Sequence, residues 1–219
     1  MNYTVIVPFY NEEKNISSFN EELLKNLKKI DNKKTNFEII YVDDGSKDNT
    51  FEELKKIKNV FFETLIIKHR TNLSQSAALN TGIINSKYDN LIIMDGDLQN
   101  DPNDLSKMIN EYEKGTDMII GWRKNRKDNF LKLISSKIAN KIRSFILKDN
   151  CVDTGCSLKV FDKEIFLSFP FFDGIHRFLP ALFKGFGKET FFIEVDHRTR
   201  ISGISKYGIL DRLFKGVLD

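Results

Sequence analysis

Short apolar runs alternate with helix-like segments along the chain, and this alternation constrains the fold more than any other feature. The runs that we expect to form strands lie at residues 3–7, 37–42, 61–67, 90–94 and, later, 191–195. Between the early runs, apolar residues recur at helical spacing over residues 16–30 and 74–84. Strands that alternate with helices require right-handed crossovers and build a mostly parallel sheet. The pattern therefore predicts one α/β domain, residues 1–219, with a central sheet flanked by helices.

Polar residues follow three of these runs at the point where each strand would end. Asn11 and Glu12 follow the first run, Asp43-Asp44-Gly45-Ser46 follows the second, and Asp95-Gly96-Asp97 follows the fourth. In sheets of this type, ligands bind outside the carboxyl ends of the strands. The three polar clusters should therefore converge on one crevice.

Asp95 and Asp97 are the most informative pair in these clusters. Carboxylates two residues apart at a strand end point the same way and repel each other unless a cation lies between them. Mg²⁺ or Mn²⁺ would relieve this repulsion while bridging two phosphates, with the amide oxygen of Gln99 as a further ligand. Turn acids in water share this pattern, but the position after a buried strand favours a metal site.

Asp43 ends the second run, where a carboxylate can accept the N–H of a base or a ribose hydroxyl. Asp48 and Thr50 follow closely, and for these two we expect a role in capping the next helix.

Charge is divided unevenly between the two halves of the chain. Residues 1–119 hold 15 Lys and Arg against 20 Asp and Glu, whereas residues 120–219 hold 19 against 11. Within the basic half, residues 123–148 hold nine basic residues and one acid, Asp128. We expect a nucleotide- and metal-binding first half and a second half that binds an anionic acceptor; the alternative for the basic stretch is a solvated face.

The sequence given contains no candidate membrane span and no secretory signal, since no stretch approaches about 18 consecutive apolar residues. Cys151 and Cys156 are too few for a disulfide framework and are expected to be reduced and structural. Residues 130–148 and 209–218 nevertheless have the amphipathic pattern of interfacial helices. For the first of these, whose apolar face is flanked by Lys132, Lys141 and Arg143, the alternative is a helix packed on the domain with its lysines in water.

Eight motifs occur in the order found in a known family. They are Val7-Pro8-Phe9-Tyr10-Asn11-Glu12, Val42-Asp43-Asp44-Gly45-Ser46, the segments 75–82 and 95–102, Gly121-Trp122-Arg123, Asp153-Thr154-Gly155-Cys156, the segment 176–182, and His197-Arg198-Thr199-Arg200 with Lys206. With these motifs the chain resembles, over essentially its whole length, the family 2 glycosyltransferases. Within that family it resembles the polyprenyl-phosphate glycosyltransferases of the dolichyl-phosphate mannose synthase type.

This resemblance implies a GT-A fold and an inverting transfer of one sugar from a nucleotide sugar to a polyprenyl phosphate. It favours a UDP-sugar over a GDP-sugar, undecaprenyl phosphate as acceptor, and work at the cytoplasmic face of the membrane. The residues that it implies are Pro8, Tyr10, Glu12, Asp43 and Asp95 for the nucleotide, Asp95, Asp97 and Gln99 for the metal, and Arg123, Lys137, Arg200 and Lys206 for the acceptor phosphate. Relatives often have a glycine shortly after the third strand, where this chain has Arg70-Thr71-Asn72-Leu73-Ser74, so that loop receives no role.

The chemistry of the acceptor agrees with this implication. A phosphomonoester, whose second pKa is about 6, is anionic at neutral pH and can attack the anomeric carbon without a strong base. The protein then mainly supplies placement and charge control. Asp153 could orient the sugar or assist proton transfer, and its alternative role is to cap the turn at Gly155. His176, next to Arg177, could touch a phosphate, but a lone histidine is more often a structural hydrogen-bonding residue. His197 follows the run at residues 191–195 and is interpreted as structural.

Two other functions fit parts of the sequence. A glycosyltransferase that extends an oligosaccharide would need a base for its hydroxyl acceptor and would have no use for four converging cations. A non-enzymatic nucleic-acid-binding module could use the basic stretch but leaves Asp95 and Asp97 unexplained, so no nucleic acid is expected as a partner. We expect peripheral membrane attachment, or anchoring by a further C-terminal segment, and leave a homo-oligomer open.

Overall fold

The structure is a computed structural model of the chain. It describes residues 1–30, 35–124, 143–144, 146–147, 149 and 151–199. The predicted acceptor residues Lys137, Arg200 and Lys206 lie outside these residues, as do most of segment 130–148 and all of segment 209–218.

Within the described residues, seven strands form one sheet, in the order β3-β2-β1-β4-β6-β5-β7. The strands are β1 (Tyr3–Phe9), β2 (Phe37–Asp43), β3 (Glu63–Lys68), β4 (Asn90–Ile93), β5 (Met118–Trp122), β6 (Lys159–Asp162) and β7 (Thr190–Glu194). β6 runs antiparallel to both neighbours, β4 and β5, and every other adjacent pair is parallel. The predicted mostly parallel α/β sheet is therefore confirmed, whereas β5 and β6 were not anticipated from the sequence.

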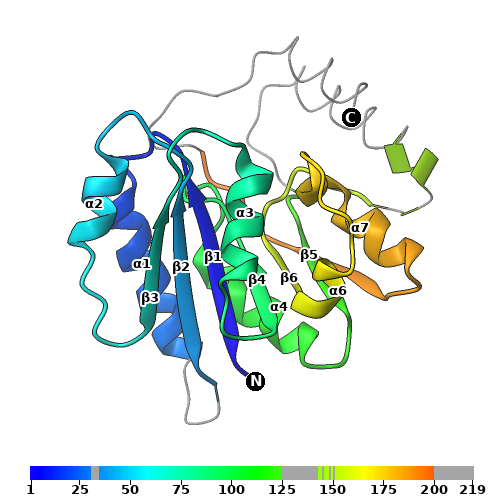
Figure 1. Ribbon diagram of the computed structural model, residues 1–219. Coiled ribbons are helices and arrows are strands. Elements are labelled where there is room, and N and C mark those ends of the chain that lie inside the picture. The colour runs from blue at the N-terminus through cyan, green and yellow to red at the C-terminus, as the bar shows by residue number, and fades with distance from the viewer. Residues whose placement is uncertain (31–34, 125–142, 145, 148, 150, 200–219) are drawn as a thin grey trace.

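Helices cover both faces of the sheet (Figure 1). They are α1 (Ile16–Ile30), α2 (Thr50–Lys56), α3 (Gln75–Ile84), α4 (Leu105–Tyr112), α6 (Lys163–Leu167) and α7 (Ile175–Gly185), with a short 3₁₀ turn η1 (Pro102–Asp104). Over the described ranges, no helix has both the length and the apolar character needed to cross a bilayer.

The two faces of the sheet bury two separate apolar clusters. Along β1, Val5 and Val7 pack on the side of α1 and α4, whereas Ile6 packs on the side of α3 and α7. This division follows from the alternation of side chains along a strand. In α1, the predicted apolar stripe is confirmed, because its members at helical spacing are fully or nearly fully buried: Ile16, Phe19, Leu23 and Leu27.

The polar segments after β1 and β2 meet at the carboxyl edge of the sheet, as predicted. The backbone N–H of Asn11 donates to Ser46 Oγ over 2.9 Å, and the N–H of Lys47 donates to Asn11 Oδ1 over 2.8 Å. The segment after β4 joins them, since a Cβ on Gly96 would lie 2.1 Å from Cε1 of Phe9, the last residue of β1. Only glycine allows this close approach, which brings the Asp95-Gly96-Asp97 turn to the same edge.

Candidate active site

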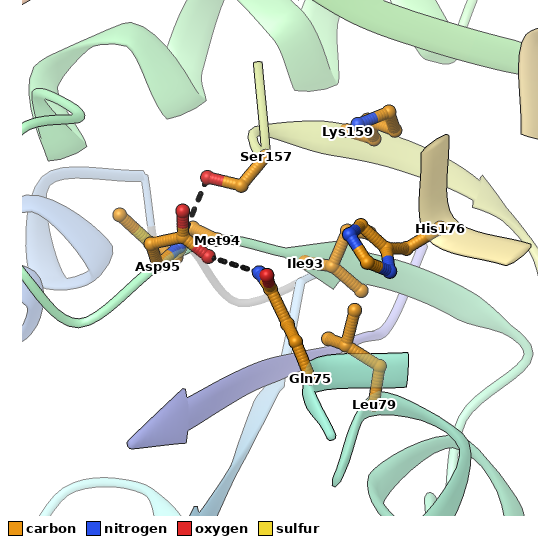
Figure 2. Close-up of a pocket in the computed structure, with 8 residues that line it drawn as sticks. All are labelled: Gln75, Leu79, Ile93, Met94, Asp95, Ser157, Lys159 and His176. Carbon is orange, nitrogen blue, oxygen red and sulfur yellow. Dashed lines mark hydrogen bonds between the residues drawn. The ribbon is translucent and has the colours of Figure 1, made fainter. Parts of the chain in front are cut away.

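Asp95 lies directly after β4 and is held by groups from two other segments. Gln75 Nε2, in the first turn of α3, donates to Asp95 Oδ1 over 2.6 Å, and the backbone N–H of Asp95 donates to Ser157 Oγ over 3.2 Å (Figure 2). Burial raises the pKa of Asp95 to about 6, with a further contribution from the negative charge of Asp97. The Asp97 carboxylate is thus close enough to disfavour the charge on Asp95, which agrees with the repulsion expected from the sequence.

Asp97 is buried within a tight turn. Its Oδ1 accepts the backbone N–H of Gln99 over 3.1 Å, and Leu98 between them has a left-handed backbone with φ of 61°. Among the described residues, no three His, Cys, Asp or Glu side chains gather as a metal cage. The oxygen donors of Asp95, Asp97 and Gln99 fit Mg²⁺ or Mn²⁺, provided that phosphate oxygens or water complete the coordination.

Asp43 is fully buried at the end of β2, and one of its two carboxylate oxygens is hydrogen-bonded to the backbone. Its Oδ1 accepts the backbone N–H of Ser46 over 3.0 Å. Its Oδ2 has no hydrogen-bond partner in the part of the chain that the structure describes. A buried carboxylate oxygen without a donor is costly, so this atom is suited to accept an N–H or O–H from a ligand.

The other residues predicted to frame a nucleoside lie near this edge. Pro8 and Tyr10 are half-buried, whereas Glu12 is buried. The backbone N–H of Glu12 donates to Thr50 Oγ1 over 2.8 Å, and Glu12 Oε2 accepts from Asn15 over 2.6 Å. Asp48 accepts the backbone N–H of Thr50 over 3.0 Å, in agreement with the expected capping role, although the residue at the helix boundary itself is Asn49.

Asp44 organises the loop at residues 70–74, for which no role was predicted. Its carboxylate accepts the backbone N–H groups of Leu73 and Ser74 over 2.9 and 3.0 Å. Asn72 Nδ2 and His69 Nδ1 each lie 2.8 Å from the same carboxylate. Ser74 has φ of 116°, a conformation suited to glycine, and it lies in the loop where the family resemblance implies a glycine. The departure from the family pattern was therefore the signal that could have located this feature.

Arg123, just after β5, forms a two-pronged ion pair with Asp153. Its Nε and Nη2 donate to Oδ2 and Oδ1 of Asp153 over 2.7 and 2.8 Å, and its backbone N–H also donates to Oδ2. Burial opposes the charged form of Arg123, yet Asp153 raises its pKa overall. A Cβ on Gly155 would lie 2.8 Å from Nη2, so glycine there leaves room for the guanidinium. Asp153 thus orients Arg123, and the acceptor role of Arg123 stays a prediction.

His176 and His197 both make internal contacts. His176 Nδ1 lies 2.7 Å from Ser76 Oγ, and burial lowers the pKa of His176 to about 3, which keeps the ring neutral. His197 is buried and pairs with Asn100 as an antiparallel bridge. The side-chain contact of His176 agrees with its interpretation as a structural residue. The bridge of His197 is made by the backbone, so the structural role of its side chain stays a prediction.

Residues 196–198 lie across the segment that follows Asp97, a contact that the sequence did not indicate. The backbone N–H of Arg198 donates to the carbonyl of Gln99 over 2.9 Å. The guanidinium of Arg198 lies 2.6 Å from carboxylate oxygens of both Glu22 and Asp101. The end of the described chain is thereby attached to the turn that carries the two carboxylates.

Arg143 and the two cysteines face the interior of the protein. Arg143 Nη1 lies 2.7 Å from the fully buried carboxylate of Asp149, so Arg143 differs from the free flanking cation suggested by the amphipathic pattern. Cys151 and Cys156 are buried free thiols.

Fold and site together define an α/β protein with a two-carboxylate turn at the carboxyl edge of its sheet. Residues 4–168 match the Glycosyl transferase family 2 model, and the chain belongs to that family. The predicted family resemblance is confirmed.

Two curated relatives support this assignment. The chain is 36% identical to the dodecaprenyl-phosphate galacturonate synthase of Rhizobium johnstonii, over 99% of this chain and 64% of the relative. It is 31% identical to the undecaprenyl-phosphate 4-deoxy-4-formamido-L-arabinose transferase of Proteus mirabilis, over 94% of this chain and 63% of that protein. The chain thus spans less than two thirds of the length of either relative.

The fold also matches a solved structure. Glucosyl-3-phosphoglycerate synthase from Mycobacterium tuberculosis, crystallised with Mn²⁺, UDP and glucosyl-3-phosphoglycerate, superposes with a TM-score of 0.69 at 16% identity, covering 98% of this chain and 75% of that one. This likeness confirms the predicted GT-A fold.

Proposed function

We propose that this chain is a catalytic domain that transfers one sugar from a nucleotide sugar to a polyprenyl phosphate, with inversion at the anomeric carbon. The observation that carries the proposal is the Asp95–Asp97 pair at the carboxyl edge of the sheet, where burial and mutual repulsion raise the pKa of Asp95. The acceptor is inferred from the two relatives, which are named for dodecaprenyl phosphate and undecaprenyl phosphate.

In this proposal Asp95, Asp97 and Gln99 hold Mg²⁺ or Mn²⁺ against the diphosphate of the donor. The bound cation would stabilise the negative charge that develops on the leaving diphosphate. Structural neighbours crystallised with Mn²⁺ and UDP, and with Mg²⁺ and UDP, support this assignment. Gln75 would keep the Asp95 carboxylate oriented through its 2.6 Å hydrogen bond.

The nucleoside would lie beside Asp43, whose buried Oδ2 is available to accept an N–H of the base. Pro8, Tyr10 and Glu12 would frame it. The UDP in the neighbouring structures favours uridine over guanosine.

At the acceptor, a phosphate oxygen would form the new bond to the anomeric carbon while the bond from that carbon to the diphosphate breaks. Arg123, kept in place by Asp153, would face the acceptor phosphate together with Lys137, Arg200 and Lys206. Because the phosphate is already anionic, this step needs placement more than a general base. A lipid acceptor stays in its bilayer, so we place the reaction at the cytoplasmic membrane face, with the domain attached peripherally or through a further segment.

Incubation of the purified protein with polyprenyl phosphate and labelled UDP- or GDP-sugars tests the proposal. We expect sugar transfer that needs a divalent cation and that Asp97→Ala abolishes while its melting temperature stays near that of the wild type. Asp89→Ala is the matched control, because Asp89 is exposed and precedes the opposite end of β4. Full activity in excess EDTA would refute the metal assignment, and transfer only to an oligosaccharide hydroxyl would refute the acceptor.

A further inference from the structure

Lys159 is a charged side chain placed in the middle of the sheet. It is 1% exposed, and on β6 it pairs with Ile93 of β4 and Ile120 of β5. Lysine is seldom buried in this way, because an ammonium group loses its hydration. Its Nζ donates to the backbone carbonyl of Cys156. In the part of the chain that the structure describes, no carboxylate lies close enough to form an ion pair with it.

The carbonyl that Lys159 holds belongs to a segment that touches both parts of the site. Three residues before Cys156, Asp153 makes the ion pair with Arg123. One residue after it, Ser157 Oγ accepts the backbone N–H of Asp95 over 3.2 Å and the side-chain amide of Asn100 over 2.6 Å. Lys159 therefore anchors the segment that connects the two-carboxylate turn to Arg123.

Lys159 also faces the same small cavity as Asp95. Figure 2 shows Lys159, Ser157, His176 and Asp95 around this space, whose volume is about 10 Å³. Burial lowers the pKa of Lys159, while nearby thiols and the carboxylates of Asp95 and Asp153 act in the opposite direction. The His176 ring is neutral, so it adds no second positive charge there.

We propose that Lys159 is a positioning residue whose buried amino group, in its protonated form, supplies a positive charge behind the two-carboxylate turn. The inference rests on the proposed function and deepens it. A positive charge at this place disfavours a metal cation bound alone and favours an anionic diphosphate. The site would then bind the metal and the diphosphate more tightly together than either one alone. The diphosphate offsets the positive charge of Lys159, which repels the metal, and the metal offsets the negative charge of the two carboxylates, which repels the diphosphate.

Binding of two simple probes to the full chain tests this role. Mn²⁺ alone is titrated by electron paramagnetic resonance, and pyrophosphate alone is titrated by calorimetry in EDTA. In Lys159→Met we expect Mn²⁺ to bind roughly threefold or more tighter and pyrophosphate roughly threefold or more weaker than in the wild type. Lys159→Arg keeps the charge and should stay close to the wild type for both probes.

Lys163→Met is the matched control. Lys163 also donates to a backbone carbonyl, that of Ser86 over 2.6 Å, but it is the first residue of α6, just beyond the other end of β6. It should change neither affinity. If Lys159→Met does not fold by circular dichroism, Lys159→Gln replaces it, because the amide can still donate to Cys156 while the charge is removed.

Opposite shifts for the two probes support the proposal, because a purely structural loosening of residues 153–157 would weaken both. Loss of both affinities, or no change in either, overturns the role of Lys159 and leaves the proposed function standing. A wild-type chain that binds neither probe overturns the donor site itself and, with it, this inference.

Discussion

Replacement of Ser74 by glycine should stabilise the fold although it deletes a side chain. Ser74 precedes α3 with φ of 116° and ψ of 159°, a region that only glycine occupies without strain. Such strain costs roughly 1–3 kcal/mol. Asp44 maintains it by accepting the N–H groups of both Leu73 and Ser74.

Two losses oppose the relief of strain. Ser74 Oγ accepts the N–H of Ala77 over 3.3 Å as a helix cap, but glycine at this position costs only a few tenths of a kcal/mol. Glycine also gains freedom in the unfolded chain, which costs about 0.5–1 kcal/mol. The net effect is a gain of about 1 kcal/mol, which for a chain of this size raises the melting temperature by about 2–4 °C.

Alanine at the same position separates strain from capping. Ser74→Ala keeps the strained backbone and removes the cap, so we expect a loss of about 1 kcal/mol. Urea unfolding of the three proteins, with equal m-values, should rank glycine above serine above alanine. A glycine variant less stable than the wild type would refute the reasoning, because it would mean that the φ of Ser74 stores little strain.

Three further predictions concern the buried His176, the basic residues Lys132 and Lys141, and the ion pair between Arg143 and Asp149. The pKa of His176 is lowered from 6.5 to about 3, so the unfolded chain binds more protons between these values. Stability should therefore fall as pH drops below about 6.5, by up to about 1.4 kcal/mol per pH unit. In His176→Gln, urea unfolding across this range should show a shallower decline, and an equal slope in both proteins would contradict the assignment. Liposome co-sedimentation tests the membrane surface: Lys132→Ser/Lys141→Ser should weaken binding to anionic vesicles at low salt and leave the melting temperature unchanged. Arg143→Ser instead leaves the buried Asp149 carboxylate without its ion-pair partner and should cost about 3 kcal/mol of stability. A melting temperature equal to that of the wild type would show that this ion pair contributes nothing to stability.

Most of the first half of the fold could be predicted because local pattern and tertiary environment agree there. β1 and β2 are buried along nearly their whole length, and the apolar runs in their sequences indicate this burial. In α1 the helical spacing of apolar residues matches the buried stripe. The position of the turn with Asp95 and Asp97 could be predicted for a similar reason. The turn follows a buried strand, and the carboxyl ends of parallel strands form the edge of the sheet at which ligands bind.

β6 could not be predicted from local pattern. It has four residues, begins with Lys159 and ends with Asp162, so no apolar alternation marks it. Lys159 can be buried there only because the Cys156 carbonyl is within reach, and that contact exists only after folding. The Arg123–Asp153 pair is hidden for a similar reason, since it joins residues 30 positions apart through the arrangement of β5 and the segment before β6.

The departures from ordinary folding rules gather at the carboxyl edge of the sheet. Ser74 has a strained backbone, and Asp43 keeps a buried oxygen that has no hydrogen-bond partner among the described residues. Asp95 has a raised pKa, and nearby in the sheet Lys159 is a buried lysine whose pKa is lowered by burial. Each of these features costs stability, so a sequence shaped for folding alone would have removed them. Their concentration at this edge agrees with the proposed donor site, in which a metal ion, a diphosphate and a base N–H would satisfy Asp95, Lys159 and Asp43.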